Sequence, residues 1–378
     1  MMQDFILQAG DLDLLVQAIR KEGFQVMGPV LRDKAITYDT VASAADLPQG
    51  WTDRQEKGCY RLERRDDDAY FGYAVGPHSW KKFLQLPRRQ VWKARKDTDD
   101  IQVTEITEEP PRMAFLGVRS CELHAIAIQD RVFVDDQHSN ENYAHRRSNL
   151  FIVAVNCTSA AATCFCTSMN TGPKVTLATD LAMTEVIDGD EHYFLIGSDS
   201  YRGSQVLRQL PVTPSGKRHE EAAARGVQNA VRQMEEGPRR FDSSDLKELL
   251  YRNYESASWD QVAERCLSCA NCTMACPTCF CSTVEDTTDL SGDHAERWER
   301  WDSCFTADFS YVTGGPVRAD TRSRYRQWMT HKLATWHDQF GSSGCVGCGR
   351  CITWCPVGID LTEEVRNIRE LEKPGPEQ

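Results

Sequence analysis

The 378-residue sequence lacks the short motifs of nucleotide binding and of common hydrolases. It contains no G-x-G-x-x-G run and no G-x4-G-K-[ST] phosphate loop, so nothing in it supports a dinucleotide or nucleotide-phosphate site. It also contains no H-E-x-x-H pair and no G-x-S-x-G nucleophile elbow. We therefore expect no catalytic residues, and no bond chemistry by this chain alone.

Long apolar runs and an excess of basic residues are also missing. No stretch approaches the roughly 18 apolar residues that cross a membrane, and the first residues lack a basic segment followed by an apolar one. Asp and Glu total 56 against 44 Lys and Arg, a formal net charge of −12, whereas nucleic-acid binding needs basic stripes. The composition predicts a protein that binds neither membranes nor nucleic acids.

Cysteine, in contrast, is abundant: the chain has sixteen. Eight of them form two copies of C-x2-C-x2-C-x3-C-P, the run that holds [4Fe–4S] clusters in bacterial ferredoxins. The first copy ends at Pro277 and the second at Pro356. So many thiols in a chain of this length belong in a reducing compartment, which predicts a cytoplasmic protein.

The spacing also predicts which cysteine serves which cluster. In two-cluster ferredoxins the fourth cysteine of each run ligates the other cluster. One cluster would thus be held by Cys266, Cys269, Cys272 and Cys355. The other would be held by Cys345, Cys348, Cys351 and Cys276. Zinc and disulfides are poorer interpretations, because zinc prefers two separated pairs and gains nothing from a third nearby cysteine.

The pattern of apolar residues predicts an α+β protein. Residues 1–210 are expected to form a mixed α/β domain, with a helix over 11–21 and strands over 113–118, 150–155 and 193–196. Residues 211–242 are expected to be a linker carrying a charged helix. Residues 243–372 are expected to be an all-helical two-cluster ferredoxin domain, because the segment between the runs is long. The tail 373–378 is expected to be disordered.

Four further cysteines form a candidate third site in the first domain. Cys121 and Cys157 each follow a strand-like run, and Cys164 and Cys166 stand in a Thr-Cys-Phe-Cys segment that is repeated at 278–281. Four thiols suffice for a third [4Fe–4S] cluster, while a zinc site and plain buried thiols remain alternatives. Cys279, Cys281, Cys304 and Cys59 are interpreted as packing residues, the first two also as candidates for tuning a nearby cluster.

Several of these motifs resemble a known family. The runs Gly344–Pro356, Gly117–Leu123 and Cys164–Met169 are similar to the beta subunits of cytoplasmic [NiFe] sulfhydrogenases and to the related A subunit of anaerobic sulfite reductase. The resemblance implies an iron–sulfur electron-transfer subunit. Its partners would be a flavin-containing, NAD(P)H-reactive subunit and the subunits that carry the [NiFe] site.

Three other functions stay open at this point. The chain would be the electron-input subunit of a sulfite reductase if its partners were sulfite reductase subunits. An iron–sulfur redox sensor would be expected to carry a DNA- or effector-binding module, and none is visible. A stand-alone dehydrogenase would need an unusual flavin pocket within residues 1–210.

Overall fold

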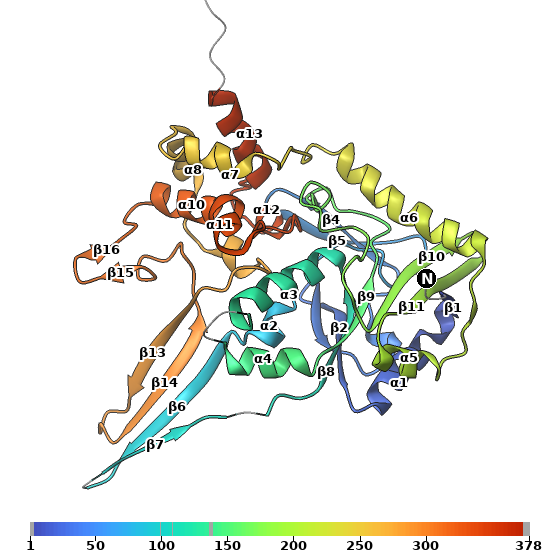
Figure 1. Ribbon diagram of the computed structural model, residues 1–378, viewed down its shortest axis with the longest axis horizontal. Coiled ribbons are helices and arrows are strands. Elements are labelled where there is room, and N and C mark those ends of the chain that lie inside the picture. Colours follow the sequence, from blue (N-terminus) through green and yellow to red (C-terminus); the bar gives the residue numbers. More distant parts are fainter. Residues whose placement is uncertain (1–3, 99, 108, 136–138, 373–378) are drawn as a thin grey trace, which may run out of the picture.

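The computed structural model describes residues 4–98, 100–107, 109–135 and 139–372 (Figure 1). The tail predicted at 373–378 lies outside the described residues. Within the described residues, no helix combines the length and the apolar character needed to cross a membrane.

An eight-stranded sheet forms the first half of the protein, in the order β12-β1-β11-β10-β9-β8-β2-β3. The pairs β2–β8, β8–β9 and β9–β10 are parallel. The remaining pairs of this sheet are antiparallel. The strands are β1 (Phe5–Gln8), β2 (Gln25–Arg32), β3 (Ala35–Thr40), β8 (Met113–Val118), β9 (Phe151–Val155), β10 (Leu181–Asp188), β11 (Glu191–Ser198) and β12 (Thr213–Pro214). The strands predicted from apolar runs are thus present, and the two central ones, β8 and β9, are buried throughout.

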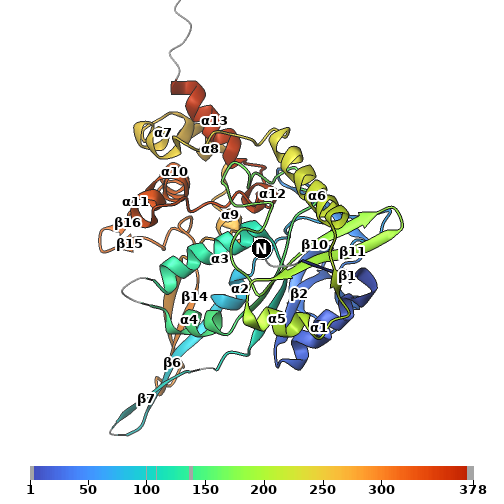
Figure 2. The ribbon, with the colours of Figure 1, turned by 45° about the vertical axis from the view of Figure 1, so that its right-hand side comes forward.

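Helices cover both faces of this sheet (Figure 2). Ala114 and Leu116 of β8 belong to the core under α1 and α5, while Met113 and Phe115 belong to the core under α2, α3 and α4. This alternation is the period of a strand buried on both sides. The helices are α1 (Leu12–Lys21), α2 (Lys81–Leu84), α3 (Ser120–Phe133), α4 (Glu141–Ser148), α5 (Tyr201–Leu207) and α6 (Lys217–Glu235), with 3-10 turns η1 (Ala9–Asp11) and η2 (Ala44–Asp46).

The helix predicted within residues 211–242 is α6, which packs on the sheet with its apolar face. Ala222 and Ala223 of α6 are buried against Ile6 and Tyr193. The same segment supplies β12, which pairs with the edge strand β1. The helix therefore covers this sheet with its alanine-rich face.

A second sheet crosses the expected domain boundary. It has the order β13-β14-β6-β7 and projects as a long arm from the body of the protein (Figure 1). Its strands are β6 (Arg88–Lys96), β7 (Ile101–Glu105), β13 (Ser282–Thr288) and β14 (His294–Trp301). The expectation of an all-helical domain over 243–372 is therefore not confirmed. Thr, Val and Trp favour strands, and cross-strand ion pairs such as Arg297–Asp286, 2.6 Å, join β13 to β14.

The remaining helices enclose the cysteine loops. They are α7 (Leu246–Arg252), α8 (Ser258–Arg265), α9 (Asn271–Met274), α10 (Thr321–Thr330), the π-helical turn η3 (His331–Thr335), α11 (Trp336–Phe340), α12 (Arg350–Thr353) and α13 (Leu361–Glu372). Trp259, Met329, Ile352 and Val365 form the centre of their core, against which the thiols of both loops pack. Two short hairpins complete the fold: β4 (Trp51–Glu56) with β5 (Cys59–Arg64), and β15 (Tyr311–Val312) with β16 (Gly315–Pro316).

Candidate metal centre

The two cysteine runs fold into loops of the same backbone shape. In the first loop Ser268 and Ala270 have φ angles of 50° and 66°, and the equivalent Gly347 and Gly349 of the second have 64° and 77°. This left-handed backbone turns the chain sharply between successive cysteines. Each loop then enters a short helix, α9 or α12.

Backbone N–H groups point at the sulfurs in both loops. Ser268 N donates to Cys266 Sγ at 3.4 Å, and Gly347 N donates to Cys345 Sγ at the same distance. Ile359 N donates to Cys355 Sγ at 3.3 Å. Such bonds stabilise the thiolate, which is the form that binds metal.

The four cysteines predicted for the first cluster come together. Cys266, Cys269, Cys272 and Cys355 line one cavity, whose walls also include Tyr325 and Trp328. Burial, followed by the neighbouring charges of Cys266, Cys355 and Cys269, raises the pKa of Cys272. Cys355 of the second run thus lies with the first, as the crossing rule predicts.

The four cysteines predicted for the second cluster are also neighbours. Burial and then the charges of Cys345, Cys348 and Cys276 raise the pKa of Cys351. Cys276 carries the opposite shift: bonds from Cys279, Lys332 and Thr278 lower its pKa. Lys332 Nζ donates to Cys276 Sγ at 3.1 Å. A buried ammonium thus holds this thiol in the form needed by a metal.

The residues around the first cavity fit a bound group that carries its own hydrogen-bond acceptors. Tyr325 Oη and Trp328 Nε1 are buried, lack hydrogen-bond partners among the described residues, and belong to side chains that line the first cavity. Buried donors normally find an acceptor. The inorganic sulfides of a cluster would supply one. No three His, Cys, Asp or Glu side chains among the described residues converge on a position for one metal ion.

Cys121, Cys157, Cys164 and Cys166 lie around a single cavity of their own, together with Cys348. Because β8 and β9 are parallel neighbours, their carboxyl ends bring Cys121 and Cys157 to one edge of the sheet. Burial raises the pKa of all four thiols, that of Cys164 to about 12. These thiols stay protonated at neutral pH unless a metal displaces the proton.

Two glycines let this third group touch the second cluster loop. A Cβ at Gly347 would lie 2.6 Å from the carbonyl oxygen of Phe165, and one at Gly349 would overlap with that of Thr163. Phe165 N donates to Gly347 O at 2.9 Å across the same contact. Glycine is needed here both for the positive φ and for the close approach of two backbones.

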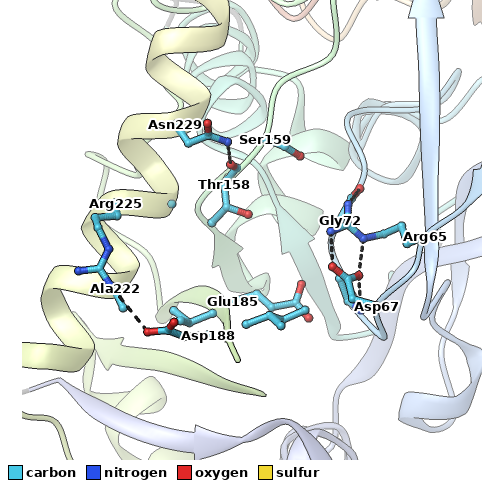
Figure 3. A pocket seen from close by; sticks show the side chains of 14 residues that line it. Arg65, Asp67, Gly72, Thr158, Ser159, Glu185, Asp188, Ala222, Arg225 and Asn229 are labelled. Carbon is cyan, nitrogen blue, oxygen red and sulfur yellow. Dashed lines mark hydrogen bonds and ion pairs between the residues drawn. The ribbon is translucent and has the colours of Figure 1, made fainter. Parts of the chain in front are cut away.

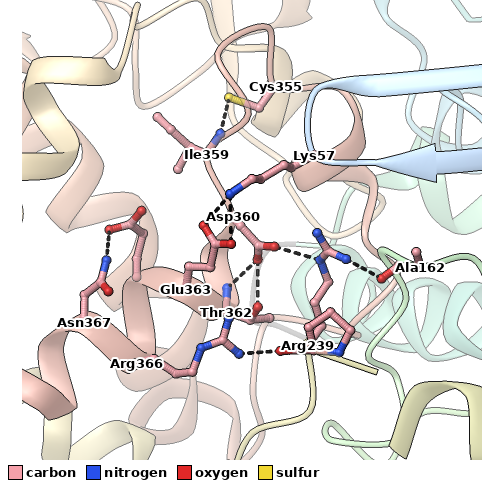
Figure 4. A network of polar contacts seen from close by, with 12 residues as sticks. Lys57, Ala162, Arg239, Cys355, Ile359, Asp360, Thr362, Glu363, Arg366 and Asn367 are labelled. Carbon is pink, nitrogen blue, oxygen red and sulfur yellow. Dashed lines mark hydrogen bonds and ion pairs between the residues drawn. The ribbon is translucent and has the colours of Figure 1, made fainter. Parts of the chain in front are cut away.

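A polar network surrounds the segment that follows the second cysteine loop (Figure 4). The sequence analysis did not predict this network. Arg239, on the segment after α6, is 2.7 Å from Asp360 and donates to Ala162 O at 2.6 Å. Asp360 in turn accepts from Thr362 N at the start of α13. Lys57 from the β4–β5 turn reaches Glu363 at 3.0 Å. The network joins the segment before Cys164 to the one after Cys355.

A separate polar pocket of about 430 Å³ lies between α6 and the first sheet (Figure 3). Its two arginines face carboxylates: Arg65 is 2.5 Å from Asp67, and Arg225 is 3.7 Å from Asp188. Glu185 accepts from Tyr70 N at 2.7 Å. With its cations paired in this way, the pocket offers little to the phosphates of a flavin nucleotide.

Three cysteines interpreted as packing residues gather around another cavity. Cys279, Cys281 and Cys304 line it together with Lys332 and His331. The only signal in the sequence was the repeated Thr-Cys-Phe-Cys segment. The sequence did not indicate that Cys304, which lies beyond the β13–β14 hairpin, would join the other two.

Comparisons with known proteins place the chain among iron–sulfur proteins. Residues 265–359 match the family described as a 4Fe-4S dicluster domain. The sulfhydrogenase 2 subunit beta of Pyrococcus furiosus is 32% identical to the chain over 303 residues, which is 77% of this chain and 82% of that protein. No solved structure matches the chain.

Proposed function

The chain belongs to the family of sulfhydrogenase beta subunits, and on that premise we propose that it relays electrons within a soluble [NiFe] hydrogenase complex. Its partners would be a flavin-containing, NAD(P)H-reactive subunit and the subunits that carry the [NiFe] site. Those partners would perform the hydride and H2 chemistry. The clusters supply one-electron transfer, and this chain holds and spaces them.

The proposal gives each cluster a set of ligands. Cys266, Cys269, Cys272 and Cys355 would hold the first cluster, and Cys345, Cys348, Cys351 and Cys276 the second. Cys121, Cys157, Cys164 and Cys166 would hold a third. Support comes from the four-thiol groups around the first and third cavities and from the mutual influence of the thiols in the second group.

One observation carries the relay: each group shares a cavity wall with the next. Cys351 of the second group lines the cavity of the first, and Cys348 of the second lines the cavity of the third. Three centres would therefore lie edge to edge, with the second in the middle. Electrons need such contiguous carriers to pass through a protein of this size.

The two ends of this series differ in exposure. Cys121 and Cys166 of the third group are buried, whereas Cys269 of the first is exposed. Leu267 and Val357, beside the first group, are 64% and 40% exposed. An exposed apolar rim next to a cluster is suited to docking a redox partner, so we place one electron-exchange surface there.

The test is to purify the chain anaerobically, alone and with co-expressed partner subunits, and to measure iron, acid-labile sulfide and EPR signals after reduction. About twelve irons per chain are expected for three clusters, and about eight would reduce the relay to two. Cys164→Ala should remove about four irons and leave the two C-terminal clusters. Unchanged iron in that variant would return the third group to buried thiols.

The partner assignment is tested separately. In the complex, NAD(P)H should reduce the EPR-active clusters only when the flavin subunit is present, and H2 only when the [NiFe] subunits are present. Co-purification with a sirohaem subunit instead would favour the sulfite reductase alternative. Cluster reduction by neither donor would contradict the relay.

A further inference from the structure

A cavity of about 360 Å³ beside the second cluster loop is lined by three thiols that the proposed relay does not use. They are Cys279, Cys281 and Cys304. Trp328, Trp336 and Phe340 form its apolar wall. Three thiols around a space of this size call for an explanation beyond packing.

The hairpin β13–β14 brings two of these thiols together. Ser282 pairs with Trp301 at the base of the hairpin, and Asp302 N donates to Cys281 O at 2.9 Å. Cys281 and Cys304 consequently lie within side-chain hydrogen-bond reach of each other. Cys279 lies beside Cys276, the cysteine assigned to the second cluster. The group therefore touches the relay without belonging to it.

Two buried ammonium groups face these thiols. Lys81 and Lys332 are 4% and 5% exposed. Lys332 Nζ donates to Cys276 Sγ and, at 2.9 Å, to Thr278 Oγ1. Lys81 Nζ donates to Cys279 O at 3.1 Å and lies 3.8 Å from the centre of the Trp301 ring.

Neither lysine forms an ion pair with a carboxylate among the described residues, and the opposite charges that act on both come from the cysteines. A buried charge is stable only when it has a partner of opposite sign. Lys332 has Cys276 as a partner, whereas burial lowers the pKa of Lys81, so a charged Lys81 would need further negative charge in the same place. An iron–sulfur cluster held by thiolates carries such charge.

The repeated Thr-Cys-Phe-Cys segment supports the same conclusion. The first copy, 163–166, contacts the second cluster loop through Phe165 N and Gly347 O. The second copy, 278–281, contacts the same loop through Thr278 Oγ1, which donates to Gly344 O at 2.7 Å. Each copy is completed by cysteines that follow strands: Cys121 and Cys157 in the first case, and Cys304 in the second. Both C-x-C segments thus contact one cluster loop, the first at Gly347 and the second at Gly344.

We propose that Cys279, Cys281 and Cys304 hold an additional [4Fe–4S] cluster whose fourth iron has no cysteine ligand and faces the cavity. This site goes beyond the proposed relay, because it requires neither the third cluster nor a partner subunit. Its four irons come in addition to the twelve of the three relay clusters, so the unmodified chain would hold about sixteen. An iron without a protein thiolate is open to a small ligand such as water, hydrosulfide or an organic thiol. Such an iron is also the one most easily lost on oxidation.

The first test is the iron and sulfide content of Cys281→Ala/Cys304→Ala, compared with the unmodified chain and with Cys59→Ala. Cys59, on β5, lines none of the three cysteine cavities and serves as the matched control. The double variant should lose about four irons and four sulfides per chain, while Cys59→Ala should lose none. The EPR signals of the first and second clusters should persist in the double variant, which shows that the surrounding fold survives.

A second test needs no variant of uncertain stability. Mild anaerobic oxidation with ferricyanide should take one electron from the open cluster of the unmodified chain and release one ferrous ion, which leaves a three-iron form with its own EPR signal. Added ferrous iron together with dithionite, which returns the electron, should reverse this. Cys59→Ala should behave identically. Absence of the three-iron signal, together with unchanged iron in the double variant, would overturn the proposal. So would a mass decrease of two hydrogens on oxidation, abolished by Cys281→Ala, since it would identify a Cys281–Cys304 disulfide pair.

The two proposals fail in distinguishable ways. Loss of iron in Cys164→Ala reports on the third cluster, and loss of iron in Cys281→Ala/Cys304→Ala reports on this site. A complex in which neither NAD(P)H nor H2 reduces the clusters would contradict the relay. The iron lost in Cys281→Ala/Cys304→Ala would be the same in either case.

Discussion

Arg350 and Glu122 form an ion pair in the interior, with side chains that are 0% and 1% exposed. Arg350 stands between Cys348 and Cys351 of the second cluster loop, and Glu122 follows Cys121 of the third group. Arg350 also donates to Gly76 O and His78 O, each at 3.0 Å, while Glu122 accepts from Tyr38 Oη and Trp80 Nε1. The pair therefore ties the two cysteine groups to one rigid network.

Breaking this pair should be costly. Glu122→Gln keeps the size of the side chain but leaves the Arg350 guanidinium buried without its counter-charge, and removing one partner of a buried pair costs about 3–5 kcal/mol. We expect the free energy of unfolding of the holoprotein to fall by that amount in chemical denaturation. Lys57→Gln, which breaks the half-exposed pair with Glu363, should cost less than about 1 kcal/mol. Equal losses in the two variants would contradict this role.

The contact between Gly349 and Thr163 predicts asymmetry between the two loops. Gly349→Ala should displace the Thr-Cys-Phe-Cys segment, because the new Cβ would overlap with Thr163 O and the φ of 77° disfavours alanine. Iron content should fall by up to about eight atoms per chain, since the second and third groups share this contact. Ala270→Gly, at the equivalent position of the first loop, should leave the iron content unchanged. Full iron content in Gly349→Ala would show that the Thr-Cys-Phe-Cys segment can shift without loss of a cluster, and would contradict this prediction.

Tyr325 should influence the reduction potential of the first cluster. Its buried hydroxyl has no partner among the described residues, and a hydrogen bond donated to the cluster would stabilise the more negative, reduced state. Tyr325→Phe should lower the potential by about 40 mV, equivalent to about 1 kcal/mol for one electron, in an EPR-monitored redox titration. Tyr311→Phe, at a side chain that is 62% exposed, is the control and should cause no shift. A potential that is the same in all three proteins would mean that the hydroxyl does not reach the cluster.

The exposed rim beside the first cluster should matter only in the complex. Leu267→Asp places a charge on a side chain that is 64% exposed, so folding and iron content should be unaffected. Electron transfer between co-expressed partners should slow severalfold, because charge disfavours the centre of an interface. Ile101→Asp, on the distant β6–β7 arm, provides a control of equal exposure at 62%. Equal rates in both variants would remove this surface from the docking site.

The sequence alone determined the chemistry of the two C-terminal sites. Thiolates spaced by two residues on a short loop have few other uses, and the same local backbone shape appears in both copies because each motif carries its own turn residues. The buried strands β8 and β9 were equally readable, since continuous apolar runs of that length are typical of a sheet covered on both faces. Because each follows such a run, Cys121 and Cys157 were predicted to share a site.

Only the tertiary structure decided which groups touch. Gly347 and Gly349 allow Thr163 and Phe165 to lie against the second loop. Lys81 lies beside Cys279, although 198 positions separate them in the sequence. The strands β13 and β14 were missed because their alternating charged residues gain stability from pairing with each other and with β6, a non-local gain that no short window contains. Local spacing thus predicted the ligands of the two C-terminal clusters, whereas long-range packing set how the cysteine groups face one another.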